Sequence, residues 1–412
     1  MKEHGAISED QERETMLEDR ISELPDGIIL HILSYLPTLI AVQMSLLSKR
    51  WRHMWTMVSA LNFCYSRDID HFRRGDERNT APKRLYKFVD ECLKRSYADT
   101  TITKFKLDME FFGSSVFVDN WLCFPVNKKV KELEIKIGYR RSIYNLPRPI
   151  LHIRSLTLLR LSGVALGALS NASLPSLKVL YFSNVEMDDE TLNSRVSGSP
   201  SLEKLYLYHC PGLLDPQVSS LSLKSMVFST GRHCRSINVE AMNLHSFEYG
   251  ERCVRAANTC SINLVRCLEI RNLMLHDGYL ADRWLEDLIS QLPFLERLSL
   301  DDDCGLRCLK ICNQHLKEFE FTSNHQLKLL EATIDTPSLV YFRYSGLSMF
   351  KLSVNAPSLI NANIKVPDYG RKTYDNEWYA NLIEFLSEFN GCKNAHIYCS
   401  SKKVFIIFVY AH

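Results

Sequence analysis

Residues 24–37, LPDGIILHILSYLP, carry apolar side chains on nearly every side of a helix. Placed at 100° per residue, these apolar positions span about 220° of the helix circumference. They are Ile28, Ile29, Leu30, Ile32, Leu33, Tyr35 and Leu36. A surface helix of a soluble protein needs an apolar stripe of only about 100°. The pattern therefore predicts a helix that is covered on more than one side.

The next segment, TLIAVQMSLLSKRWRHMW at residues 38–55, predicts two further short helices. Its first half is apolar all round, and then Trp51, Met54, Trp55 and Val58 recur at i, i+3, i+4 and i+7. We expect Thr38 to cap the second helix. Three helices within roughly 40 residues cannot enclose this much apolar surface. We therefore expect the module both to pack on the following chain and to bind an obligatory partner.

From about residue 130 the pattern changes to a repeat, in which an apolar anchor precedes an apolar–x–apolar strand. The clearest copies are LPSLKVLYFSNVEM, SPSLEKLYLYHCPGL, LPFLERLSLDDDCGL and TPSLVYFRYSGL. The predicted anchors are Leu156, Leu177, Leu202, Leu223, Leu244, Leu264, Leu295, Leu316, Leu339 and Leu359. Their steps are 21, 25, 21, 21, 20, 31, 21, 23 and 20 residues.

Periods of this length are typical of leucine-rich repeats, in which each coil of a curved solenoid contributes one short strand. Within the 31-residue step, Leu280, Trp284, Leu288 and Leu292 recur at fourfold spacing, which predicts that one convex segment is a helix. The predicted fold is an α/β repeat: a short N-terminal three-helix module followed by a curved leucine-rich-repeat solenoid.

Side chains between the strand leucines should face the concave surface, because successive residues of a strand alternate. These candidate target-binding residues are Glu134, Arg160, Tyr181, Tyr206, Tyr208, Glu248, Arg271, Asp301, Glu320, Arg343 and Asn363. They are aromatic in the early repeats and mixed in charge afterwards, which favours a protein or peptide partner over a nucleic acid. A solvated face without a partner is the alternative for any one of them.

The composition is ordinary for a soluble globular protein, with 46% hydrophobic and 24% charged residues. A net charge of +2 argues against selection for a polyanion, although it leaves room for a local basic patch. There is no run of about 20 apolar residues and no apolar signal-peptide core, so we expect no membrane partner and a location in the nucleus or cytoplasm.

No catalytic constellation is recognisable. The sequence has no glycine-rich phosphate loop, G-x-S-x-G elbow or HExxH motif, and we expect neither a cofactor nor a metal. The 13 cysteines lack zinc-ligand spacing, which predicts buried or half-buried free thiols. The carboxylates at 301–303 are compatible with a cation site, but a solvated turn is the favoured interpretation.

LPDGIILHILSYLPT followed by LLSKRW and a further tryptophan closely resembles the F-box motif, especially that of plant F-box proteins with leucine-rich repeats. The segments at 86–111 and 382–401 are similar to the lead-in of that family and to the start of its FBD segment. With this resemblance the predicted organisation is a disordered tail (1–18), the F-box (19–61), a linker and N-terminal cap (62–129), the repeats (130–390) and a terminal repeat resembling the start of an FBD segment (391–412).

The resemblance implies a non-catalytic, substrate-recruiting subunit of an SCF ubiquitin ligase, which binds a Skp-type adaptor and through it a cullin and a ring-finger subunit. The implied adaptor contacts are Leu24, Pro25, Ile28, Ile32, Leu33, Leu36, Leu47, Ser48, Trp51 and Trp55, of which Trp55 is expected to be core. The repeats would bind an unidentified target protein. The alternatives are a non-catalytic scaffold and a small-molecule receptor, each acting without ubiquitin transfer.

Overall fold

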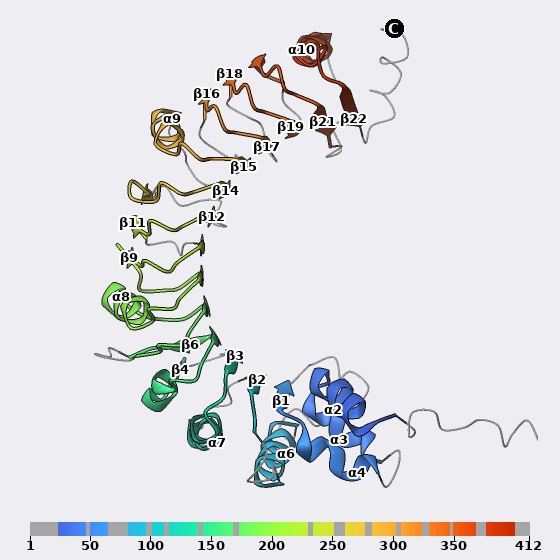
Figure 1. The fold of residues 1–412 in the computed structure, drawn as a ribbon, viewed down its shortest axis with the longest axis vertical. Coiled ribbons are helices and arrows are strands. Elements are labelled where there is room, and N and C mark those ends of the chain that lie inside the picture. Colours follow the sequence, from blue (N-terminus) through green and yellow to red (C-terminus); the bar gives the residue numbers. More distant parts are fainter. Residues whose placement is uncertain are drawn as a thin grey trace, which may run out of the picture. The chain divides into compact units, whose positions relative to one another are not determined.

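The computed structural model describes fourteen segments of the chain (Figure 1). They are residues 24–46, 50–64, 81–95, 101–110, 115–138, 143–167, 173–229, 234–250, 260–276, 282–301, 306–323, 329–346, 349–367 and 376–399. The chain divides into two compact units, residues 1–142 and 143–412. The sequence pattern placed the start of the repeats at residue 130, and that boundary stays a prediction.

The first unit begins with the short helices that the sequence predicts. They are α2 (Asp26–Tyr35), α3 (Thr38–Met44), α4 (Trp51–Met54) and the 3₁₀ helix η1 (Trp55–Met57). Helices α2 and α3 each begin directly after a proline, whose fixed φ suits a helix start. Neither has a side-chain cap, so their stability depends on tertiary packing.

The expectation that Thr38 caps the second helix is wrong. Pro37 occupies the cap position, and Thr38 is the first residue of α3. The Thr38 hydroxyl is buried and accepts a hydrogen bond from the Asn62 amide at 2.8 Å. Because Asn62 lies in β1 (Ala60–Cys64), this bond joins α3 to the first strand of the unit.

The rest of the first unit continues with a strand–helix alternation. Helix α6 (Ala81–Arg95) precedes β2 (Lys104–Glu110), and α7 (Ser115–Lys128) precedes β3 (Glu132–Gly138). Strands β1, β2 and β3 pair in parallel, with Leu61, Phe105 and Leu133 in register. All three side chains are buried, so the predicted lead-in to the repeats already has the parallel geometry of the repeats.

The second unit is a stack of coils, each of which adds one strand to a parallel sheet. The strands are β5 (Leu158–Ser162), β7 (Val179–Ser183), β8 (Lys204–Tyr208), β10 (Ser225–Ser229), β12 (Ser246–Gly250), β14 (Asn272–His276), β15 (Arg297–Asp301), β17 (Glu318–Thr322), β19 (Tyr341–Ser345), β21 (Asn361–Val366) and β22 (Asn394–Cys399). In Figure 1 they line the inner edge of this unit's arc, whereas α8 (Asp189–Ser197) and α9 (Asp282–Ser290) lie on the outer edge.

The apolar anchors form the spine of these coils. All ten predicted anchor leucines are buried. Nine of them stand two residues before a strand, but Leu264 does not, because it follows the convex strand β13 (Ser261–Asn263). The residue that precedes β14 in the equivalent way is the buried Ile270. The anchors of this region are therefore Leu244, Ile270 and Leu295, so the predicted steps of 20 and 31 residues become 26 and 25.

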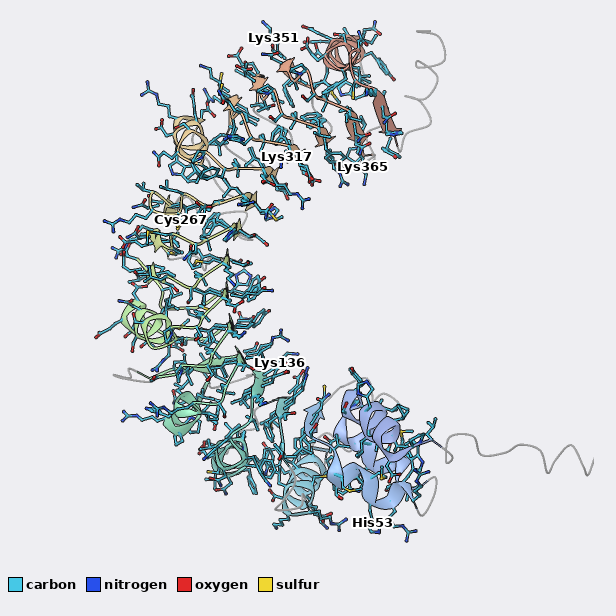
Figure 2. The ribbon with its side chains drawn as sticks, viewed as in Figure 1. His53, Lys136, Cys267, Lys317, Lys351 and Lys365 are labelled. Carbon is cyan, nitrogen blue, oxygen red and sulfur yellow. The ribbon has the colours of Figure 1, made fainter. Side chains whose placement is uncertain are left out.

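The convex side alternates between strands and helices. Strands β9 (Gln217–Ser219), β11 (Ser236–Glu240) and β13 form one parallel sheet, and β16 (Cys308–Cys312), β18 (Glu331–Asp335) and β20 (Lys351–Asn355) form another. The short β4 (Tyr144–Asn145) pairs with β6 (Val164–Ala165), and η3 (Arg148–His152) lies between them in sequence. Figure 2 labels Lys351 of β20 on the outer edge and Lys365 of β21 on the inner edge.

The predicted convex helix is confirmed as α9, and two more helices, α8 and α10 (Asn376–Ser387), were not predicted. Asp188 caps α8 by accepting a hydrogen bond from the Thr191 amide at 2.8 Å. Helix α10 buries Phe385 against the last coils, where its ring lies 5.2 Å from that of Tyr344. The terminal coil therefore has an aromatic core.

Candidate partner-binding surfaces

Helix α2 has two apolar sides, and only one of them is buried. Ile29 and Leu33 are 0% and 1% exposed and pack inside the module. Ile28, Ile32 and Tyr35 are 47%, 37% and 74% exposed, and their i, i+4, i+7 spacing puts them on one face. We call these three residues the outer face of α2. The predicted surplus of apolar surface is therefore present and is concentrated on this face.

The structure contradicts part of the predicted adaptor-contact set. Leu33 and Trp51 are each 1% exposed and Trp55 is 7% exposed, so their side chains form the core of the module. The resemblance could not separate them from surface residues, because a helix in a small module presents its motif residues to both sides. The expectation that Trp55 belongs to the core is confirmed.

The other predicted contacts have mixed positions. Pro25 is exposed at the start of α2, and Leu24 and Leu36 are half-buried at its two ends. Leu47 and Ser48 lie outside the described residues. The module also exposes Leu46 and Met57, two large apolar side chains that the sequence argument did not select.

An ion pair fixes the start of α2. Arg50 donates from Nε to Asp26 Oδ1 at 3.0 Å, which links the first turn of α2 to the residue before α4. A carboxylate in the first turn also interacts favourably with the helix dipole. Because both side chains are substantially exposed, we assign this pair a positioning role and little stabilising energy.

The second unit presents two rows of side chains on the inner edge of its arc. The central row follows the middle residue of each strand, and strand register aligns Arg160, Tyr181 and Tyr206 in it. Glu248, Glu320, Arg343 and Asn363 occupy the same row farther along. Tyr208 and Asp301 lie in the adjacent row, two residues later on their strands. Glu134 has the equivalent central position on β3 of the first unit.

Arg271 does not belong to the concave rows, and that prediction is wrong. It precedes β14, where its guanidinium lies 3.7 Å from Glu296. The central position of β14 is taken by Met274, which is in register with Glu248 and Ser299. The error follows from the misplaced anchor at Leu264, since Ile270 sets the register of this strand.

A recess of about 510 Å³ opens on the concave side of the second unit. Its lining residues are Tyr181, Ser183, Tyr208, His209, Val227, Ser229, Glu248, Gly250, His276 and Asp301. Four of these residues were predicted from the sequence. The others belong mostly to the second row, and counting two positions on from each central residue would have found Ser183, Ser229 and His276.

One wall of the recess is aromatic. The ring centroids of Tyr181 and Tyr208 are 5.3 Å apart, and those of Tyr181 and Tyr206 are 5.8 Å apart. The Arg160 guanidinium lies 4.9 Å from the centroid of the Tyr181 ring. This distance is typical of a cation–π contact, so the wall already binds one guanidinium group.

The floor of the recess is made by small residues. Strands β10 and β12 contribute Ser229 and Gly250 in register, beside the buried Val227. A Cβ atom added at Gly250 would have the Cβ of His276 as its one neighbour within 4 Å, at 3.8 Å. The hollow therefore exists because two successive strands carry little or no side chain at this position.

Carboxylates occupy the other wall. Glu248 and Asp301 are both half-buried, on β12 and β15. Within the described part of the chain, Glu248 has no hydrogen-bond or ion-pair partner. The recess thus combines aromatic faces with negative charge, a combination suited to cationic groups.

The charged residues just before the concave strands form a series of ion pairs between neighbouring coils, which we call the charged ladder. Glu203 lies 3.6 Å from Lys178 and 3.5 Å from Lys224, and Glu296 lies between Arg271 and Lys317 in the same way. The two lysines hold the pKa of Glu203 below its usual range. These pairs are solvated and contribute little stability, so we assign them no binding role.

Several cysteines of the described segments are buried and unreactive. Burial raises the pKa of the Cys92 and Cys210 thiols to about 12 and that of Cys267 to about 11. Such thiols are protonated at neutral pH and are poor nucleophiles. The prediction of buried or half-buried thiols is wrong for Cys123 and Cys312, which are exposed.

Neither a metal cluster nor a membrane span is apparent where side chains are described. No group of three or more histidine, cysteine, aspartate or glutamate residues among them is arranged to hold a metal ion. None of the described helices is both long and apolar enough to cross a bilayer.

Family models match two ranges of the chain. The F-box domain model matches residues 21–62, and the model of the leucine-rich repeats of the FBD-associated F-box protein At5g56370 matches residues 118–271. These two ranges contain the outer face of α2 and the aromatic wall of the recess, respectively.

Similar curated proteins come from Arabidopsis thaliana. The putative F-box/LRR-repeat protein At3g18150 is 27% identical over 86% of this chain and 73% of its own length. The F-box/FBD/LRR-repeat protein At5g56420 is 34% identical over 50% of this chain and 49% of its own length, so the match spans about half of that relative. This chain is thus similar to plant F-box proteins with FBD-associated leucine-rich repeats, in its F-box range and in part of its repeats.

Proposed function

We propose that this F-box protein with leucine-rich repeats is the substrate-recruiting subunit of an SCF-type ubiquitin ligase. The F-box would bind a Skp-type adaptor, which joins it to a cullin and a ring-finger subunit, and the repeats would bind a target protein. The chain itself would perform no catalysis. It would raise the effective concentration of target lysines near a charged conjugating enzyme.

The observation that carries this proposal is the outer face of α2. Ile28, Ile32 and Tyr35 expose apolar surface on a helix whose opposite side already forms the module core. Contiguous exposed apolar residues mark interaction sites, because leaving them in water is unfavourable. F-box domains generally bind Skp-type adaptors, so this face is the natural candidate for that contact.

The energetics favour a stable complex. Complete burial of an isoleucine or leucine side chain contributes about 1.5–3 kcal/mol. The outer face and the exposed Leu46 together supply enough apolar surface to offset several kcal/mol lost on association. No buried ion pair is required, so the interface would depend on shape and apolar area.

The test is co-purification of the full chain with a Skp-type adaptor and a cullin. Ile32→Asp places a charge in the middle of the outer face, and we expect it to weaken adaptor binding by at least about 100-fold, since an unpaired charge would be buried. Gln43→Glu, which introduces a charge at an exposed position on α3, is the matched control and should bind normally. Circular dichroism checks that both variants fold.

Two results would reject the proposal. Normal adaptor binding by a folded Ile32→Asp protein would exclude the outer face as the contact. Adaptor binding without any cullin in the complex would favour the alternative, a non-catalytic scaffold that acts without ubiquitin transfer. We also propose that the protein acts in the nucleus or the cytoplasm, which a fluorescent fusion of the full chain would test.

A further inference from the structure

The concave recess suggests which class of target the repeats bind, an inference that rests on the function proposed above. Its second-row residues Tyr208, Ser229, Gly250, His276 and Asp301 follow one another in strand register. Adjacent strands lie about 4.8 Å apart, so this row is about 19 Å long from Tyr208 to Asp301. An extended peptide of about six residues has the same length.

The negative charge of the recess favours a basic peptide. Among the described residues that line it, Glu248 and Asp301 are the carboxylates, and none is a lysine or an arginine. An acidic segment would be repelled here, and so would a nucleic acid backbone. A lysine or arginine side chain is attracted by these carboxylates, and its aliphatic stem can pack against the tyrosine wall of the recess.

The spacing of the carboxylates favours a peptide over a small cation. Glu248 on β12 and Asp301 on β15 stand two strand steps apart, which is about 10 Å between their backbone positions, and Asp301 is also two residues further along its strand. A single ammonium group pairs with both carboxylates only if both side chains lean toward it. Two cationic side chains two residues apart lie on the same face of an extended segment, and their long stems can reach one carboxylate each.

The neighbouring residue Arg160 provides an internal precedent. Its guanidinium already lies on the Tyr181 ring, 4.9 Å from the centroid, so this wall binds the same chemical group within the chain. We propose that the recess binds an extended basic segment of the target protein, with one lysine or arginine at Glu248, a second at Asp301, and the rest of the segment against Tyr181 and Tyr208.

The test uses the full chain purified with its Skp-type adaptor and short fluorescein-labelled peptides that contain two lysines separated by one glycine, which puts both lysines on one face of an extended peptide. Fluorescence anisotropy compares these peptides with the same peptides carrying acetyl-lysine or glutamate at both positions. We expect the lysine peptide to bind at least about tenfold more tightly than either, because acetylation removes the charge and glutamate reverses it.

Two variants locate the binding in the recess. Glu248→Gln combined with Asp301→Asn removes both charges and should weaken lysine-peptide binding by at least about tenfold. Gly250→Val leaves the charges unchanged but fills the floor, and its Cβ would meet no described atom closer than the His276 Cβ at 3.8 Å. It should reduce binding to a similar extent. Glu296→Gln, which removes a half-buried carboxylate of the charged ladder outside the recess, is the matched control and should bind normally.

The outcomes separate this inference from the proposed function. Adaptor and cullin co-purification with all these variants tests the F-box role independently of the recess. Equal binding of lysine and acetyl-lysine peptides would overturn the inference, and so would unchanged binding by the double variant. Competition by spermidine at the same concentration as the unlabelled peptide would also overturn it, because the recess would then be a site for small cations.

Discussion

Helix α2 and the concave strands of the second unit both alternate between buried and exposed residues, but their exposed sides differ in chemistry. The exposed side of α2 is apolar, with Ile28, Ile32 and Tyr35. The concave positions of β7, β8 and β12 are half-buried and carry tyrosine, serine and glutamate instead, beside fully buried leucines and phenylalanines.

This difference indicates two kinds of binding. An apolar helix face is stable in water only when a partner covers it, which suits a constitutive subunit contact. A row of tyrosines and carboxylates is solvated when empty and gains specificity from charge when filled, which suits a target that binds and leaves. On the proposed function, α2 would therefore make a lasting subunit contact, and the concave rows would make a reversible contact with a target.

The two regions also secure their helices differently. Helices α2 and α3 begin after prolines and have no side-chain cap, so they depend on the buried core around Trp51. Helix α8 of the solenoid has a local cap at Asp188. Substitutions in the module core and at the α8 cap should therefore destabilise the protein to different extents. Three experiments test the comparison.

The largest expected effect is that of Trp51→Ala. Removing this fully buried ring leaves a cavity in the module core, and we expect a loss of about 3–5 kcal/mol in unfolding free energy. Hydrogen exchange should rise in α2, α3 and η1. Gln43→Ala, at an exposed position of α3, should change the free energy by less than about 0.5 kcal/mol. A loss below about 1 kcal/mol for Trp51→Ala would contradict the dependence of these helices on core packing.

A smaller effect is expected from Asp188→Ala. Loss of the cap should destabilise the second unit by about 1 kcal/mol in urea denaturation, whereas Asp188→Asn should retain most of the stability. The bonds that Thr191 donates hold the pKa of Asp188 below its usual range. The part of the stabilisation that depends on the charge is therefore present at neutral pH and is lost as the pH falls through the lowered pKa. A difference between the wild type and Asp188→Ala that did not shrink at still lower pH would exclude the charge of Asp188 as a contributor.

The smallest expected effect is the dependence of binding on salt, which should differ between the recess and the outer face of α2. Raising the salt concentration from about 50 to about 500 mM shortens the screening length severalfold. Lysine-peptide binding at the recess should weaken a few-fold, while adaptor binding through the outer face of α2 should stay the same or strengthen. Measuring both with one preparation of the full chain removes differences in protein quality. A salt response of the same sign and size at both surfaces would contradict the distinction drawn here.

The repeat pattern predicted most of the strands, because a leucine that anchors a coil is buried whatever its neighbours do. It failed around Leu264, where a convex strand provides an equally apolar residue and Ile270 is the true anchor. A register error moves every following side chain of a strand, which is why Arg271 was placed on the wrong surface and Met274 was missed. Helix α8 escaped prediction because its polar sequence, DETLNSRVS, shows little apolar periodicity.

The recess was beyond a sequence argument for a different reason. Tyr181, Tyr208, Glu248 and Asp301 were each predicted to face the concave side, but nothing in the sequence showed that Ser229 and Gly250 leave a hollow between them. That hollow depends on the alignment of five strands spread over nearly a hundred residues. Ser229 and Gly250 form one floor only because β10 and β12 pair with these two residues in register.

The sequence by itself determined the two architectures, since the all-round apolar helix and the anchor period each follow from local spacing. It also determined that the first helix carries more apolar surface than its module can bury. The tertiary structure decided which apolar residues remain outside. Helix α2 packs against α4, η1 and β1, so that Leu33, Trp51 and Trp55 lie in the core. Ile28, Ile32 and Tyr35 remain exposed on the other side of α2. Spacing fixes the faces of a helix, whereas only its neighbours decide which face is covered.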